Sequence, residues 1–107
     1  MKQLSDFEIG VLTGLFSAEG SFGGDGRQPQ LTLKLHPRRQ PLADWLLETV
    51  EGSRLHGPYE SGGRGWLQWS TRGKALVMLL EQIEEPICRL DAHAASRIEA
   101  MRSRYRL

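Results

Sequence analysis

The first twenty residues place hydrophobic side chains at the spacing of an α-helix. These positions recur every three or four residues, and they are Phe7, Val11, Leu12, Leu15 and Phe16. Ser5 followed three residues later by Glu8 matches a capping box, and Gly20 is typical of a helix end. We therefore predict a helix from Ser5 to Glu19 that is buried on nearly all sides.

Two stretches of alternating polar and apolar residues follow, and each contains a glycine-rich turn. Alternation predicts strands with one apolar face, because successive strand side chains point to opposite sides. The predicted arms are 21–22 with 30–36 and 54–59 with 66–70, and the turns between them are 23–26 and 61–65. In the last arm we expect Leu67 and Trp69 to face inward, and Trp66, Gln68 and Ser70 to face outward.

Helical spacing also marks the segment after each hairpin. Pro41, a residue favoured in the first turn of helices, begins a helix that ends before Gly52. Thr71 is the expected cap of a third helix that runs to Pro86, and a helical tail follows from Ile87. The apolar positions are Leu42, Trp45, Leu46 and Val50 in the second helix and Leu76, Val77, Leu79, Leu80 and Ile83 in the third.

The predicted order of elements is αββαββα, in one domain over 1–107 whose residues 87–107 form the C-terminal helical tail. Two hairpins with one apolar face each predict an α+β fold, in which a four-stranded antiparallel sheet carries helices on one face and leaves the other open. A chain of 107 residues has the size of one small domain, and it contains no repeat or low-complexity linker.

Composition sets further bounds on the function. The hydrophobic share of 39% and the charged share of 25% are ordinary for a globular chain. Cys88 is the lone cysteine, and there is no signal peptide or membrane-spanning apolar run, so we expect a protein of the reducing cytoplasm with no membrane partner. A net charge of +1 does not mark a strongly basic nucleic-acid binder, so the placement of charges matters more.

The open sheet face is predicted to carry side chains that hydrogen-bond or carry positive charge. Such side chains match base edges in the DNA major groove, which admits a two-stranded ribbon, so we expect double-stranded DNA as a partner. A solvated sheet face without a partner is the alternative. The candidate DNA contacts are Arg27, Gln28, Gln30, Thr32, Lys34, Arg38, Arg39, Arg54, Arg64, Trp66, Gln68 and Ser70.

The first helix also carries a stripe of small residues at helical spacing, made of Gly10, Thr13, Gly14 and Ser17. A glycine inside a soluble helix costs about 1 kcal/mol relative to alanine, so two of them call for a compensating contact. Small side chains let two helix backbones approach closely. We therefore expect this stripe to pack against another helix.

Glu19 lies at the end of the same helix, where the helix dipole is negative and a carboxylate is slightly disfavoured. A bound cation would reverse that penalty. Mg²⁺ is commonly held by one or two carboxylates together with water and substrate phosphate, so Glu19 and the carbonyl of Gly20 are candidate ligands. An exposed glutamate with no ligand is the alternative.

Residues 12–20, with the sequence Leu-Thr-Gly-Leu-Phe-Ser-Ala-Glu-Gly, are followed by Ser21 and Phe22 and resemble the LAGLIDADG motif of homing endonucleases. The αββαββα order over Phe7 to Pro86, the Gly-Pro-Tyr segment and the Trp-Gln-Trp strand are also similar to that family. Because only one motif is present, the resemblance implies a homodimer with the small-residue stripes packed at its axis. It further implies that the dimer cuts both DNA strands at a near-palindromic target with the help of a divalent metal.

The same resemblance assigns roles to single residues. Glu19 would be the catalytic, metal-binding carboxylate, and His36 would organise water near the scissile phosphate, although a phosphate contact or a plain surface histidine remain alternatives. Many active members carry a lysine near the start of the helix after the third one, whereas residues 89–93 here are Arg-Leu-Asp-Ala-His. The alternative function is therefore a DNA-binding module or regulator of this fold that does not cleave.

Overall fold

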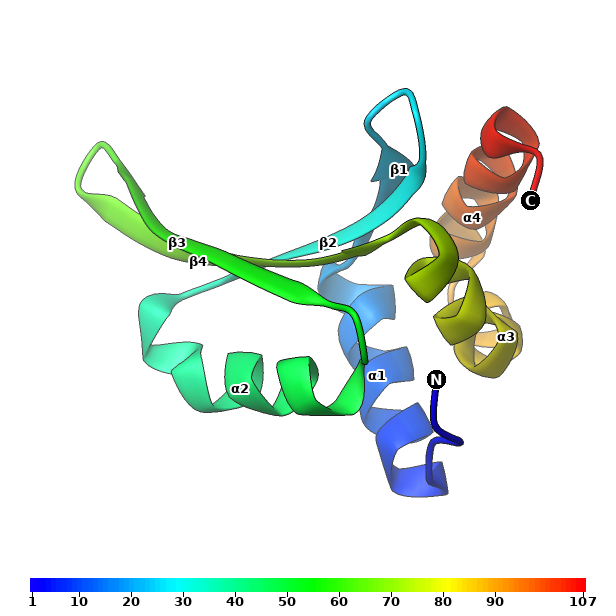
Figure 1. Ribbon diagram of the computed structural model, residues 1–107, viewed down its shortest axis with the longest axis horizontal. Coiled ribbons are helices and arrows are strands. Elements are labelled where there is room, and N and C mark those ends of the chain that lie inside the picture. The colour runs from blue at the N-terminus through cyan, green and yellow to red at the C-terminus, as the bar shows by residue number, and fades with distance from the viewer.

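Four strands form one antiparallel sheet in the computed structural model, which describes all residues from 1 to 107. They lie in the order β1-β2-β4-β3, with bounds β1 Ser21–Gly24, β2 Pro29–Leu35, β3 Arg54–Ser61 and β4 Arg64–Arg72. The helices are α1 Asp6–Glu19, α2 Gln40–Thr49, α3 Gly73–Leu90 and α4 Ala92–Tyr105, with a short 3₁₀ turn η1 at Pro37–Arg39. Figure 1 shows the helices gathered on one side of the sheet and α4 standing beside β1. The predicted α+β class is confirmed.

The start of α1 forms as the sequence predicts. The Ser5 side chain accepts a hydrogen bond from the amide of Glu8 at 3.1 Å, and the Glu8 carboxylate accepts one from the amide of Ser5 at 2.8 Å. This reciprocal pair satisfies two amides that have no partner within the helix. The backbone hydrogen bond from Ser5 is the main reason that the pKa of the Glu8 carboxyl is lowered.

The core lies between the sheet and the helices. Inward-facing residues of β2 and β4 alternate with outward ones along each strand, and the buried inward members are Pro29, Leu31, Leu33, Leu35, Leu67, Trp69 and Thr71. Phe16 of α1 stacks on Trp69 with ring centroids 5.3 Å apart, which joins the first helix to the centre of the sheet. Ala94, Ile98 and Met101 of α4 complete the same core.

The second hairpin is longer than the sequence predicts. The expected five-residue connection over 61–65 is wrong, because pairing continues to Ser61 and Arg64 and leaves only Gly62 and Gly63 in the turn. Both glycines have positive φ, 58° and 78°. Two-residue hairpin turns require this left-handed backbone, which glycine adopts without a steric cost.

The bounds of the third helix also differ from the prediction. Thr71 does not cap it but belongs to β4, and the helix begins at Gly73 without a side-chain cap. The helix also passes through Pro86 and ends at Leu90, since Ile87 beyond the proline is fully buried in the core. The tail is a separate helix that begins at Ala92.

The break before α4 is set by Asp91 rather than by proline. Its carboxylate accepts hydrogen bonds from the amides of His93 at 2.9 Å and Ala94 at 3.1 Å, which caps the new helix.

No helix of the chain is both long enough and apolar enough to cross a membrane.

Candidate functional site

The open face of the sheet is concave and polar. Both hairpin tips rise on the side of the sheet opposite α1 and α2 in Figure 1, and the face between them contains a hollow. Strand register aligns its outward side chains in rows across the sheet, because paired residues point to the same side. The rows are Gln30 with Arg72, then Thr32 with Ser70 and Arg54, then Lys34 with Gln68 and His56. We refer to these residues as the polar face.

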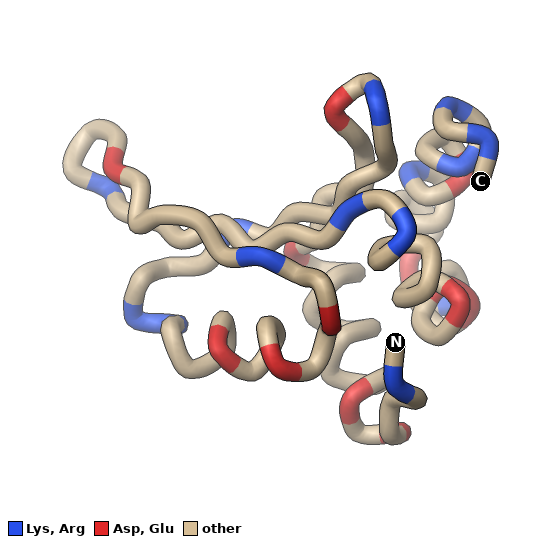
Figure 2. The backbone as a smooth tube through the Cα atoms, viewed as in Figure 1, with Lys and Arg blue, Asp and Glu red and all other residues tan.

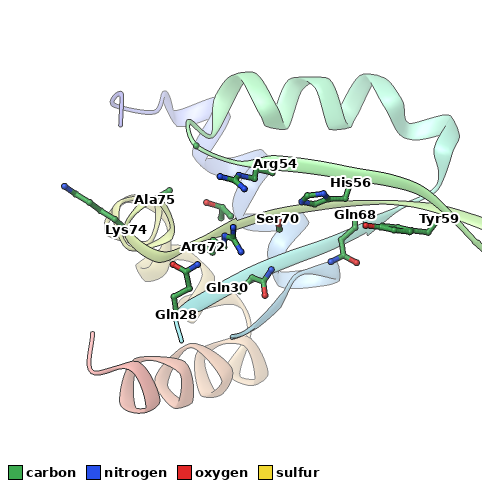
Figure 3. Close-up of a pocket in the computed structure, with 12 residues that line it drawn as sticks. Gln28, Gln30, Arg54, His56, Tyr59, Gln68, Ser70, Arg72, Lys74 and Ala75 are labelled. Atoms are coloured by element: carbon green, nitrogen blue, oxygen red, sulfur yellow. The ribbon is translucent and has the colours of Figure 1, made fainter. Parts of the chain in front are cut away.

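A hollow that runs along the polar face carries positive charge. It is lined by 12 residues, among them Arg54, Arg72 and Lys74, and none of the 12 is acidic. Figure 3 shows Arg54, Arg72 and Gln30 projecting from three neighbouring strands on the same side of the sheet, whereas Lys74 points outward from the start of α3. The hollow therefore suits an anionic group flanked by hydrogen-bonding surfaces.

The cations of the polar face form no ion pair, although Arg72 lies near enough to Asp25 to interact with its carboxylate electrostatically. The three ion pairs of the chain join Lys2 to Glu8, Arg89 to Glu85 and Arg102 to Glu84, all away from this face. Figure 2 shows Asp and Glu residues along α2, which lies on the opposite side of the sheet. Because no ion pair holds these cations, they remain available to an anionic partner.

An aromatic pair occupies the far end of the polar face. Tyr59 and Trp66 lie on neighbouring strands with ring centroids 5.6 Å apart, and the Lys34 ammonium lies 5.1 Å from the centroid of the Trp66 ring. The indole N–H of Trp66 is buried and has no hydrogen-bond partner, so it is not exposed to read a base. Trp66 instead supports the positions of Lys34 and Tyr59.

The remaining predicted contacts divide between the hairpin turns and η1. Arg27 and Gln28 belong to the β1–β2 turn, and Arg64 begins β4 beside the glycine turn. Arg38 and Arg39 lie in η1, which joins β2 to α2 on the helix side of the sheet. The structure therefore gathers most of the predicted side chains on one face but leaves the two η1 arginines outside it. Ser70 lies on that face but is only 6% exposed, contrary to the expectation of an open contact.

His36 has a structural contact that the sequence does not reveal. Its Nδ1 accepts a hydrogen bond from the amide of Arg38 at 3.1 Å, which caps η1. A neutral imidazole that accepts through Nδ1 carries its proton on Nε2. His36 thus offers an N–H donor to a partner rather than a free basic nitrogen.

Helix α1 leaves one face uncovered. Of the four small residues in the predicted stripe, Gly10 and Gly14 are exposed, Ser17 is half-buried, and Thr13 is only 4% exposed. Phe7, with 72% of its surface exposed, contradicts the expectation that α1 is buried on nearly all sides. The uncovered face consists of Phe7, Gly10, Gly14 and Ala18, which we call the α1 strip; a Cβ at Gly10 or Gly14 would meet no atom within 4 Å.

Glu19 is exposed at the C-terminal end of α1, two residues before β1 begins. The last turn of α1 contains no basic residue that would neutralise it. No group of three or more His, Cys, Asp or Glu side chains is arranged to hold a metal ion. One carboxylate beside the free carbonyls of a helix end fits part of a Mg²⁺ site, whose other ligands would come from water, a phosphate or a second chain.

Sequence reasoning did not select Arg72, Lys74, His56 or Tyr59 as functional residues. Arg72 continues the outward alternation of β4, but the expectation that Thr71 caps a helix ended the strand too early to include it. Lys74 lines the hollow because α3 begins at Gly73. Tyr59 also lines it, after a bulge that shifts the register of β3 between His56 and Tyr59. No simple sequence pattern signals such a bulge.

Comparison with known proteins assigns no family to this geometry. No model of a known protein family matches the chain, and no curated protein is similar to it in sequence.

Proposed function

We propose that the chain is a site-specific, double-stranded DNA endonuclease of the LAGLIDADG homing type that acts as a homodimer. The observation that carries the proposal is the polar face: a concave sheet surface with rows of hydrogen-bonding side chains and cations that form no ion pair. Antiparallel ribbons of this kind fit the DNA major groove. The LAGLIDADG-like sequence of residues 12–20 supports the same assignment.

The polar face contains the side chains that DNA recognition needs. Gln30 and Gln68 have amides suited to adenine, which presents one donor and one acceptor in the major groove. Arg54 and Arg72 suit either guanine or a backbone phosphate, and neutralising phosphates contributes most of the sequence-independent affinity. The His36 N–H also suits a phosphate oxygen, which favours that role over proton abstraction from water.

The α1 strip supports the homodimer. Phe7 is a large apolar side chain exposed to water, and the open space beside Gly10 and Gly14 would let a second helix approach closely. The strip contains no charged residue, so a second copy of α1 would cover it without burying an unpaired charge. In such a pair each chain would contribute one Glu19.

Glu19 and the carbonyl of Gly20 are the residues that would hold Mg²⁺. When bound, the metal would supply positive charge against the scissile phosphate and an activated water. Arg54 and Arg72 would meanwhile hold the DNA backbone in register, while the polar face holds the base edges. The chain's own contribution is thus to position the substrate.

One observation favours the alternative of a DNA-binding module that does not cleave. Arg89 is paired with the Glu85 carboxylate one helical turn earlier, and His93 is exposed on α4. Neither replaces the lysine that many active members carry in this region. In this alternative the homodimer still binds DNA through the polar face, but it does not cleave the phosphodiester bond.

The proposal is tested with a randomised duplex DNA library and Mg²⁺, by sequencing both the cut and the retained fragments. Wild type is expected to cut a near-palindromic sequence, Glu19→Gln to retain it uncut, and Glu99→Gln, a matched exposed glutamate on α4, to cut as wild type does. Retention without cutting by wild type would support the binding module. Neither cutting nor retention would refute both functions.

A further inference from the structure

The turn between β1 and β2, which carries Arg27 and Gln28, is ordered by its own hydrogen bonds. The Asp25 carboxylate accepts hydrogen bonds from the amides of Arg27 and Gln28, each at 2.9 Å. These bonds, led by the one from Gln28, lower the pKa of the Asp25 carboxyl. Because all the partners lie within the turn, they fix its shape but not its position relative to the sheet.

Tyr105, the last residue of α4, contacts this turn from outside. Its hydroxyl accepts a hydrogen bond from the amide of Gly26 at 2.9 Å, across a sequence separation of 79 residues. Its ring packs so closely on Gly24 that a Cβ there would collide with it. Figure 1 shows the C-terminal part of α4 near the β1–β2 hairpin.

Helix α4 is itself held firmly by the rest of the fold. Met101 is buried in the core, and Arg102 donates two hydrogen bonds to the Glu84 carboxylate of α3, one of them from Nε at 2.8 Å. Arg97 donates to the carbonyl of Phe22 at 3.3 Å, which adds a second contact between α4 and β1. The turn is therefore tied, through Tyr105, to the hydrophobic core.

We infer that Tyr105 is a positioning residue, which holds the β1–β2 turn, and with it Arg27 and Gln28, in place before a partner binds. A turn that is already ordered raises affinity, since the cost of ordering it is not taken from the binding free energy. The effect on the affinity for DNA rests on the proposed function, whereas the anchoring of the β1–β2 turn by Tyr105 does not. Helix α4 would in this way raise the affinity of the polar face for a partner that the helix itself does not contact.

The anchoring is tested in the free protein with Tyr105→Phe, which keeps the ring against Gly24 and removes only the hydroxyl. Hydrogen exchange at the Gly26 amide, measured by NMR, is expected to rise roughly fivefold. Ser103→Ala, a matched change at an exposed position of the same helical turn, is expected to leave that rate unchanged. An unchanged rate in Tyr105→Phe would overturn the inference.

The effect on binding is tested with the duplex that the library retains. Tyr105→Phe is expected to lower the affinity roughly three- to tenfold, and the loss should largely disappear in an Arg27→Ala background. If Arg27→Ala weakens binding but Tyr105→Phe does not, the positioning role is refuted. If wild type binds no duplex, the proposed function and the DNA role fail together, and the exchange rate at Gly26 still decides the anchoring.

Discussion

The α1 strip and the polar face are both uncovered in the single chain, yet their chemistry is opposite. The strip holds Phe7, two glycines and an alanine without charge or hydrogen-bonding side chains. The polar face holds arginine, lysine, glutamine, serine and threonine in rows set by strand register. An apolar surface gains free energy when it is removed from water, whereas polar groups lose free energy unless a partner replaces their hydrogen bonds.

The two surfaces therefore suit different partners. The α1 strip fits a surface like itself, because identical apolar helices bury each other without leaving unsatisfied groups. The polar face fits a partner that is anionic and rich in hydrogen-bonding groups, as DNA is. Changes to the α1 strip, the polar face and the β1–β2 turn test whether these surfaces act as proposed.

Gly14→Leu is expected to weaken dimerisation by roughly a hundredfold, because its side chain would fill the space that a second helix needs. The same change should stabilise the single chain by about 1 kcal/mol, since leucine favours a helix more than glycine does and no atom lies near that position. Sedimentation and denaturant unfolding measure the two effects. Ser96→Leu on α4 is the control, and a Gly14→Leu protein that dimerises like wild type would rule out the strip as the interface.

Arg54→Gln and Arg72→Gln are each expected to lower duplex affinity by about tenfold without changing the preferred sequence, if both side chains contact phosphates. Binding titrations on matched and mismatched duplexes measure both quantities. Arg89→Gln, at an arginine already paired with Glu85, should bind like wild type. A changed sequence preference in Arg54→Gln or Arg72→Gln would instead assign that arginine to a base.

Gly24→Ala and Gly23→Ala compare two neighbouring residues on the edge strand of the sheet. An added Cβ at Gly24 collides with the Tyr105 ring, whereas one at Gly23 meets no atom within 4 Å. Gly24→Ala is therefore expected to cost about 1 kcal/mol of unfolding free energy through the displaced tyrosine, and Gly23→Ala to cost little. Equal stabilities in a urea titration would contradict the close packing of α4 on β1.

The smallest expected effect is a pH dependence of the β1–β2 turn. The pKa of Asp25 is lowered in the folded chain, so its ionised form contributes order above the ordinary value of 3.8, and that order is lost as the pH falls through the lower folded value. An NMR titration should give the Arg27 and Gln28 amides a shared midpoint below 3.8. A midpoint at or above that value would show that the carboxylate does not hold the turn.

Local patterns in the sequence predict much of this fold. Ser5 and Glu8 signal the start of α1 because a capping box involves neighbouring residues only, and alternation in β2 correctly separates Leu31 and Leu33 from the outward Thr32. The composition of the polar face follows from the same alternation. These features depend on contacts within a few residues or on a strict period of two.

Contacts between distant residues set the features that the sequence does not predict. Pro86 normally ends a helix, but burial of Ile87 in the core carries α3 past it. The exposure of Phe7 and the burial of Thr13 depend on which side of α1 meets α3 and the sheet. Tyr105 reaches Gly26 across 79 residues, and no local pattern indicates that contact.

The salt dependence of duplex binding by wild type tests directly whether the polar face binds DNA. If the polar face binds the DNA backbone, the logarithm of affinity should fall linearly with the logarithm of salt concentration, with a slope that gains nearly one unit for each phosphate neutralised. Several cations outside any ion pair on this face predict a slope of several units. An affinity that does not change with salt would contradict the assignment of the polar face to DNA.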